Sequence, residues 1–306
     1  MIDSHPQVLE AAIEAGKAIL KVYNASETIE VTTKSDDSPL TAADQASNTV
    51  INSYLKDTGI PIISEENKQT DYEERKSWEK CWIVDPLDGT KEFIKKNGEF
   101  TVNIALCEKG KPIFGVIYVP VTRELYYGDT REGKSFKTVL DQNHTLPEKL
   151  GAPADRIEPA AEDPDTLRVV GSRSHMNAET ENYIASMKDK YRDIEIVSKG
   201  SSLKFCLVAE GLADVYPRYA PTMEWDTAAG SAIAEAAGLK VIAQDTDAPL
   251  KYNKENLLNP HFLVCKQWPQ TAVISDISQR RLPGVLWARW IPSSSPGSSQ
   301  ETRSRA

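Results

Sequence analysis

The sequence predicts an α/β protein whose N-terminal half is α+β and whose C-terminal half is α/β. Apolar residues recur at helical spacing over residues 5–24. Two long apolar runs, residues 100–108 and 112–119, flank Lys109-Gly110-Lys111, which is the pattern of a hairpin. Beyond residue 166, short apolar runs alternate with helical segments that stop at Gly211 and Gly238.

The remaining elements follow from the same signals. Thr41 is placed to cap a second helix that ends near Leu55. Residues 121–166 are rich in charge, Pro and Ala, which predicts irregular surface structure with Tyr126 and Tyr127 as the one candidate short strand. We expect further strands at 60–64, 82–85, 167–171, 194–197, 213–216 and 239–242, and further helices at 202–210 and 227–237.

This pattern predicts an N-terminal subdomain over 1–155, a C-terminal subdomain over 156–266 and a disordered tail over 267–306. The tail contains four prolines, a run of three serines, and five Arg against two acidic residues. Its Trp287 and Trp290 suit a weak contact with a partner or membrane. A non-native extension without a role is the alternative.

Composition narrows the class of function. A net charge of −9 on 306 residues argues against nucleic acid as a partner. The sequence contains no run of about 18 apolar residues, so we expect no membrane span. Five acidic residues among the first 30 do not fit a secretory signal. Four widely spaced cysteines predict buried, reduced thiols, so we expect a cytoplasmic protein, with peripheral contact at the inner membrane as an alternative. The sequence predicts no oligomeric state.

The strongest chemical signal is the string from Trp82 to Thr90, WIVDPLDGT. An apolar strand delivers Asp85 at its end, Pro86 turns the chain, and Asp88 returns a second carboxylate toward the same place. Two such carboxylates repel each other unless a cation lies between them. Oxygen ligands of this kind suit Mg²⁺. The alternative, a solvated acidic turn, explains an Asp-Pro pair but not the whole string.

Two further acidic clusters occupy similar positions. Glu65 and Glu66 follow the apolar run at 60–64, and Asp226 stands just before an Ala-rich helix. Taken alone, the first pair is an ordinary loop start and Asp226 an ordinary N-cap. Three acid clusters at strand ends or helix starts together indicate a metal site.

These residues resemble the signatures of the inositol-monophosphatase-like phosphatases, over roughly residues 5–266. The resemblance implies a layered αβαβα sandwich with the site between its halves. It also implies two or three Mg²⁺ ions as the cofactor. Glu66 and Lys34 are implied to lie behind the metal ligands and to support them. The implied metal ligands are Glu65, Asp85, the Leu87 carbonyl, Asp88 and Asp226.

The segment from Lys34 to Asp44 resembles the mobile loop of this family and the acid that follows it. The resemblance implies that Asp44, paired with Thr90, orients and deprotonates the attacking water. A carboxylate base suffices near neutral pH when a metal activates the water. Favourable placement of Asp44 in the first turn of a helix is the alternative. The amides of Gly89 and Thr90 are expected to hold phosphate oxygens.

The C-terminal half indicates which phosphate ester fits. Small residues and two cations open the helix near 202, Arg218 ends the next strand, and residues 171–175 are basic and rich in hydroxyls. Together they suit a second phosphate group. The strings GSSLKF, YPR and YNKENLLNP resemble the CysQ-type 3′(2′),5′-bisphosphate nucleotidases. Nucleotide contacts are thereby implied for His175, Ser201, Lys204 and Arg218.

The resemblance implies hydrolysis of adenosine 3′,5′-bisphosphate to AMP and phosphate, a step linked to sulfate assimilation, and inhibition by Li⁺. Ser231 departs from related sequences, which often carry His there. A phosphatase of the same superfamily that acts on inositol or sugar phosphates is one alternative. A non-catalytic phosphate-binding regulator is another. The expected partner is a small nucleotide, with no nucleic acid and no stable membrane span.

Overall fold

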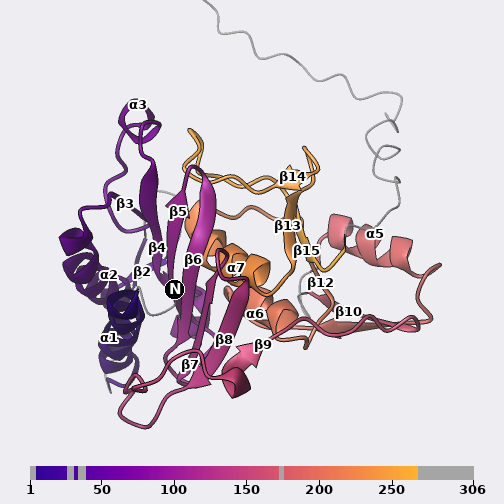
Figure 1. Ribbon diagram of the computed structural model, residues 1–306, viewed down its shortest axis with the longest axis horizontal. Helices are drawn as coiled ribbons and strands as arrows, with labels where there is room; N and C mark the ends of the chain where they lie inside the picture. The colour runs from indigo at the N-terminus through magenta and orange to yellow at the C-terminus, as the bar shows by residue number, and fades with distance from the viewer. Residues whose placement is uncertain (1–4, 26–30, 34–38, 172–175, 268–306) are drawn as a thin grey trace, which may run out of the picture. The chain divides into compact units, whose positions relative to one another are not determined.

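Helical and sheet layers alternate in the computed structural model (Figure 1). The structure describes residues 5–25, 31–33, 39–171 and 176–267, which belong to one compact unit, Met1–Trp268. The order is a helix pair, a seven-stranded sheet, a second helix pair, a six-stranded sheet and an outer helix. The predicted αβαβα sandwich is therefore confirmed.

The seven-stranded sheet supplies the frame of the N-terminal half. Its order is β3-β4-β5-β6-β7-β8-β9. Strands β3 and β4 are parallel, and every later pair is antiparallel. The strands are β3 (Ile62–Ser64), β4 (Lys80–Asp88), β5 (Thr101–Glu108), β6 (Lys111–Val119), β7 (Glu124–Asp129), β8 (Lys134–Val139) and β9 (Arg156–Ile157). The β5–β6 hairpin confirms the predicted one.

Both faces of this sheet are buried, which explains its continuous apolar runs. Trp82 and Val84 pack in the cluster with α1 (Pro6–Tyr23) and α2 (Ala42–Leu55). The alternate residues Cys81 and Ile83 pack in the cluster with α6 (Leu203–Ala209) and α7 (Glu224–Ala236). All four cysteines are free and buried, as predicted.

The six-stranded sheet lies on the far side of α6 and α7, in the order β11-β10-β12-β15-β13-β14. Its parallel pairs β10–β11 and β10–β12 match the predicted α/β pattern, whereas β15 runs antiparallel between β12 and β13. Met187 on α5 (Ala178–Met187) packs against its outer face. The strands are β10 (Thr166–Val170), β11 (Asp193–Val197), β12 (Val215–Arg218), β13 (Lys240–Ala243), β14 (Ala248–Pro249) and β15 (Phe262–Cys265).

Short elements complete the described chain. The two-stranded sheet β1–β2 precedes α2, and two 3-10 turns lie before β3 and β9. Helix α4 begins directly after the WIVDPLDG string. Their bounds are β1 (Val31–Thr33), β2 (Pro39–Thr41), η2 (Lys56–Thr58), α3 (Tyr72–Arg75), α4 (Thr90–Ile94) and η3 (Pro153–Asp155).

The prediction of irregular surface structure over 121–166 is wrong for most of its first half. Residues 124–129 and 134–139 form strands β7 and β8. The short strand predicted at Tyr126 and Tyr127 is confirmed as part of β7, and both tyrosines are buried. The tyrosine hydroxyls reach polar partners, since Tyr126 Oη lies 3.1 Å from Glu210 Oε1. Charged neighbours thus concealed the full length of β7 and the whole of β8.

Close approach of α7 to this sheet depends on glycine. A Cβ at Gly115 would lie 2.5 Å from the Ala229 carbonyl, and one at Gly128 would lie 3.1 Å from the Cα of Ile233. The Ala-rich face of α7 therefore packs backbone against backbone.

The predicted boundary at 155/156 stays a prediction. Strand β9 belongs to the first sheet, and the second sheet starts at β10. The predicted tail lies outside the described residues from 268 onward. None of the helices among the described residues combines the length and apolarity that a membrane crossing needs.

Candidate active site

The end of β4 presents the two carboxylates of the DPLDG string. Asp85 is buried, and its Oδ1 accepts the backbone N–H of Leu87 at 3.0 Å. The predicted turn at Pro86 is wrong, because β4 continues to Asp88 with a shift of register against β5 between Asp85 and Asp88. This irregularity, not a reversal of the chain, places both carboxylates at one end of the strand.

Asp88 is held by two residues that the sequence analysis missed. The Ser202 hydroxyl lies 2.5 Å from Asp88 Oδ2 and 2.8 Å from the backbone oxygen of Asp226, and its single proton serves one of them. Asn103 Nδ2 donates to Ser202 Oγ at 2.9 Å and to Asp88 Oδ2 at 3.3 Å. Both supporting residues are buried. A polar Asn between Val102 and Ile104 in an apolar strand was the available signal.

Asp226 lies in the first turn of α7, so the prediction that it precedes the helix is wrong. The helix begins at Glu224, and Asp226 Oδ2 accepts the backbone N–H of Met223 at 2.8 Å. A carboxylate three residues past the N-cap is a favourable start for a helix. It leaves the second oxygen, Oδ1, without a part in that cap.

The segment from Tyr252 to Asn259 wraps the start of α7. Asn259 Nδ2 donates to the Met223 carbonyl at 2.7 Å. Buried Glu224 accepts the backbone N–H of Asn253 at 2.5 Å and the ammonium of Lys254 at 2.5 Å. The string YNKENLLNP therefore fixes the helix that carries Asp226.

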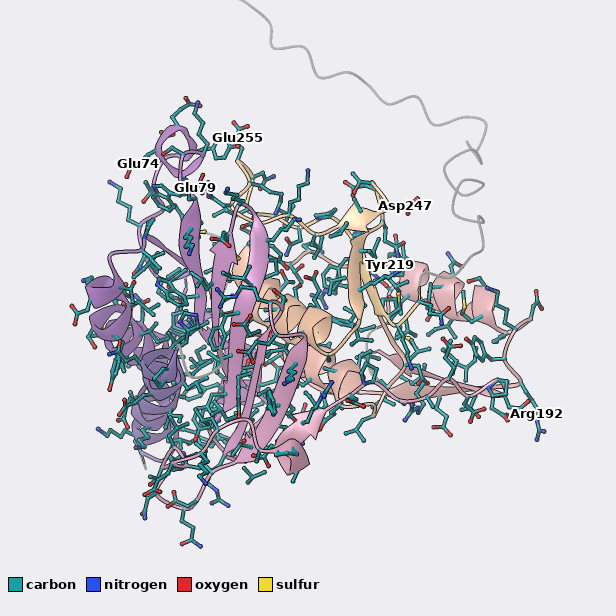
Figure 2. All side chains as sticks on the ribbon, viewed as in Figure 1. Glu74, Glu79, Arg192, Tyr219, Asp247 and Glu255 are labelled. Atoms are coloured by element: carbon teal, nitrogen blue, oxygen red, sulfur yellow. The ribbon has the colours of Figure 1, made fainter. Side chains whose placement is uncertain are left out.

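The same segment is joined to α3. Arg75, which is buried, donates to Asn253 Oδ1 at 2.7 Å and to the Lys254 carbonyl at 3.1 Å. Figure 2 shows the neighbouring residues Glu74 and Glu255 at the same end of the molecule. The chain after the Glu65-Glu66 pair is thereby tied to the start of α7.

Glu65 and Glu66 follow β3, which runs parallel to β4, so the ends of both strands meet at one edge of the sheet. The backbone N–H of Glu65 bonds the Val84 carbonyl at 3.2 Å. Glu66 Oε2 accepts from Gln45 Nε2 of α2 at 3.2 Å.

Four carboxylates affect one another here. Burial raises the pKa of Asp85 well above its usual range, and the charges of Glu65, Asp88 and Asp226 raise it further. Burial, followed by the charge of Asp88, raises the pKa of Asp226 to about 7. Both shifts mean that the protein alone disfavours the ionised state.

A divalent cation fits this donor set. The candidate ligands are carboxylate and carbonyl oxygens, which hard cations prefer, and positive charge reverses the effect that raises these pKa values. Over the described ranges, no three acidic, histidine or cysteine side chains are already gathered around one point. The four carboxylates are thus neighbours, not a preformed cage.

Asp44 and Thr90 meet beside these carboxylates. Asp44 is buried in the first turn of α2, where its Oδ2 accepts the backbone N–H of Thr41 at 2.8 Å and the Thr41 hydroxyl at 2.6 Å. The Thr90 hydroxyl lies 3.4 Å from Asp44 Oδ1. The helix-start role and the pairing with Thr90 therefore use different oxygens of one carboxylate.

Gly89 joins β4 to α4 in a conformation that favours glycine. Its φ is +93°, and a Cβ there would lie 2.1 Å from the Ser201 hydroxyl. That hydroxyl lies 2.8 Å from the Asp88 carbonyl and 2.7 Å from the Glu99 carbonyl. Ser201, predicted to contact substrate, holds the DPLDG loop in this structure.

Two cations lie next to this loop. Lys204 Nζ donates to the Ser201 carbonyl at 3.0 Å, and burial lowers the pKa of Lys204. Arg218 donates through Nη2 to the Pro221 carbonyl at 3.1 Å, while its buried Nε has no hydrogen-bond partner among the described residues. Lys204 interacts electrostatically with Asp88, and Arg218 with Asp226. Lys34 and His175 lie outside the described residues.

The departure at position 231 is accommodated within the core. Ser231 is buried, and its hydroxyl lies 2.6 Å from the Tyr252 hydroxyl, which itself lies 3.2 Å from Thr227 Oγ1. Ser231 thus joins α7 to the segment that wraps its start.

An acidic site at the ends of β3 and β4 and the start of α7, within an αβαβα sandwich, is the arrangement of a metal-dependent phosphatase. The inositol monophosphatase family matches residues 6–281, and the chain belongs to this family.

Curated relatives narrow the comparison. The chain is 46% identical over 260 residues to "3′(2′),5′-bisphosphate nucleotidase CysQ" of Salmonella typhimurium, covering 84% of this chain and 98% of the relative. A protein of the same name from Haemophilus influenzae is 36% identical over 264 residues, with 84% and 91% covered.

Solved structures agree with the fold. The crystal structure of CysQ from Bacteroides thetaiotaomicron, described as a bacterial member of the inositol monophosphatase family, superposes with a TM-score of 0.75 at 48% identity and covers 86% of this chain and 97% of that one. An IMPase of Thermotoga maritima shares the fold alone, with a TM-score of 0.62 at 21% identity, 84% of this chain and 90% of that one being covered.

Proposed function

We propose that this chain is a Mg²⁺-dependent 3′(2′),5′-bisphosphate nucleotidase that converts adenosine 3′,5′-bisphosphate to AMP and phosphate. The observation that carries the proposal is that Glu65, Asp88 and Asp226 all lie close enough to raise the pKa of buried Asp85, beside the Asp44–Thr90 pair. It occurs in a chain that matches bisphosphate nucleotidases over 84% of its length. We place the enzyme in the cytoplasm, in a clearance step linked to sulfate assimilation.

The metal ligands in this proposal are Glu65, Asp85, the carbonyl of Leu87, Asp88 and Asp226, which hold two or three Mg²⁺ ions. The bound cations supply positive charge that offsets these carboxylates, activates water and stabilises charge on the phosphoryl group. Glu66 and Lys34 support the ligands from behind.

Asp44 and Thr90 direct the water. The Thr90 hydroxyl donates toward Asp44 Oδ1, so its oxygen can accept a hydrogen bond from the water. Water attacks phosphorus, its proton passes toward Asp44, and the bond from phosphorus to the ribose 3′ oxygen breaks. That oxygen then takes up a proton to give the 3′-hydroxyl.

The second phosphate and the nucleoside are held by Lys204 and Arg218, together with His175 and the backbone near Ser201. A buried guanidinium nitrogen without a partner and a desolvated ammonium form an environment that favours an anion. The backbone N–H groups of Gly89 and Thr90 hold the phosphate that is cleaved.

The test is phosphate release at saturating and zero Mg²⁺ from adenosine 3′,5′-bisphosphate, inositol 1-phosphate and fructose 1,6-bisphosphate. We expect preference for the nucleotide, dependence on Mg²⁺ and inhibition by Li⁺. Asp88→Asn should abolish turnover because it removes one ligand charge, while Asp57→Asn, on an exposed 3-10 turn, should not.

The alternatives have distinct outcomes. Preference for inositol 1-phosphate or fructose 1,6-bisphosphate would refute the substrate assignment and leave the phosphatase. Mg²⁺-independent release would refute the metal dependence, whereas no release from any of these esters would refute the phosphatase and favour a phosphate-binding regulator.

A further inference from the structure

Helix α2 contributes more than Asp44 to this site. Its buried face carries Ser47 and Asn48, one turn further along, with exposed fractions of 0% and 8%. Spacings of three and four residues place all three side chains on one face. Burying polar groups on a helix destabilises it unless their hydrogen bonds are satisfied. The partners of these two side chains therefore indicate why the face is not apolar.

Ser47 bonds the irregular part of β4 that follows its first ligand, Asp85. Its hydroxyl donates to the Pro86 carbonyl at 2.6 Å. Pro86 stands between Asp85 and Asp88, at the shift of register in β4. This bond fixes the irregular part of the strand to a rigid helix.

Asn48 bonds the other ligand loop. Its Oδ1 accepts the Ser64 hydroxyl at 3.0 Å, and its Nδ2 donates to Asn67 Oδ1 at 2.9 Å. These partners lie on either side of Glu65 and Glu66. Asn52, one turn further on, bonds both Asn48 and Asn67 and completes the network.

One face of one helix thus contacts three segments, at Thr90, at Pro86 and at the pair Ser64/Asn67, and the segments at Pro86 and at Ser64/Asn67 are called the ligand loops below. We propose that Ser47 and Asn48 are positioning residues that hold the two ligand loops in register with Asp44. That these loops hold metal ligands rests on the proposed function. That Ser47 and Asn48 hold the loops in place rests on the hydrogen bonds alone.

The test compares Ser47→Ala and Asn48→Ala with two controls on the same helix. Ser53→Ala removes the same hydroxyl from an exposed position where it bonds only the Val50 carbonyl. Ile51→Val lowers stability by trimming a residue that is 1% exposed. Both controls leave the ligand loops untouched.

Mg²⁺ binding to the substrate-free protein is measured by calorimetry, and Mn²⁺ binding by electron paramagnetic resonance. We expect Ser47→Ala and Asn48→Ala each to weaken binding roughly tenfold, as loss of support behind a metal ligand does. Ile51→Val and Ser53→Ala should bind like wild type. Equal binding by Ser47→Ala and wild type would overturn the proposal, and so would equal weakening by Ile51→Val.

Amide hydrogen exchange supplies a readout that needs no metal. Ser47→Ala should speed exchange at residues 86–90, and Asn48→Ala at residues 64–67, each beyond any effect of Ile51→Val. Uniform acceleration throughout the protein would indicate a purely structural role and refute the proposal. If the wild-type protein binds no Mg²⁺, the proposed function fails, and the exchange pattern alone decides how the loops are held.

Discussion

Replacing Ser202 by Ala tests how Asp88 is oriented. The Ser202 hydroxyl is the closest described donor to Asp88 Oδ2, at 2.5 Å, and it also accepts from Asn103 at 2.9 Å. A hydrogen bond to a charged group contributes about 1.5–3 kcal/mol, and about 1.4 kcal/mol corresponds to a tenfold change. Asn103 keeps only its longer contact with Asp88, at 3.3 Å. We therefore expect the Mg²⁺ concentration for half-maximal activity to rise roughly tenfold to a hundredfold.

The assay is the initial rate of phosphate release over a Mg²⁺ titration at saturating nucleotide. Ser186→Ala is the matched control, because that exposed hydroxyl on α5 donates only to the Tyr183 carbonyl. Thermal unfolding of both variants separates local from global effects, since Ser202 makes no side-chain cap for α6. An unchanged half-saturating Mg²⁺ concentration for Ser202→Ala would refute the reasoning.

Three further substitutions test other parts of the structure. Gly89→Ala should lower kcat/KM at least roughly tenfold, because it combines left-handed backbone strain with a Cβ 2.1 Å from a serine hydroxyl. The control is Gly133→Ala, where φ is +61° and a Cβ would meet open space. Equal losses of kcat/KM in the two variants would contradict the argument. Burial raises the pKa of Glu235 to about 7, so the folded state binds the proton more tightly than the unfolded state, and stability should fall between pH 4.5 and 7. In urea unfolding, the free energy of unfolding of Glu235→Gln relative to wild type should rise by about 1–3 kcal/mol from pH 5 to pH 8. A difference between the two proteins that does not change with pH would argue against this. Lys254→Met leaves fully buried Glu224 without its cation and should lower the free energy of unfolding by about 2–4 kcal/mol. Denaturant titration at pH 7 measures this loss. A loss below about 0.5 kcal/mol, which is typical of an exposed pair, would count against the prediction.

The sequence predicted the part of the site that is local in the chain. In the string from Trp82 to Thr90, an apolar strand, two acids, a glycine and a helix start lie within nine residues, so the strand and the register shift within it bring these groups close together. The position of Glu65 and Glu66 beside this string was predictable for a related reason, since parallel strands end at one edge of a sheet.

What the sequence did not predict depends on contacts between distant segments. Ser202 and Asn103 are 99 residues apart and meet only after α6 packs on the first sheet. Strand β8 was missed, and β7 was predicted only at Tyr126 and Tyr127, because the charged residues along these strands are paired with one another and with the end of α6, as Lys137 is with Glu124 and Glu210. Strand β15 enters the second sheet antiparallel between two strands that precede it, an order that no local pattern encodes.

The tight seam around α7 has a consequence for how this enzyme tolerates change. Phe205 of α6 presses on Gly230, where a Cβ would lie 2.4 Å from its ring, while Gly115 and Gly128 admit the helix on its other side. Close packing on two sides of α7 thus leaves the helix no room to slide or rotate. A helix rotates about 100° per residue, so one residue inserted within α7, between Asp226 and Gly230, must either break the packing at Gly230 or turn Asp226 away from the site. Insertions at this point of the helix should therefore not be tolerated, whereas insertions in loops away from the site should be.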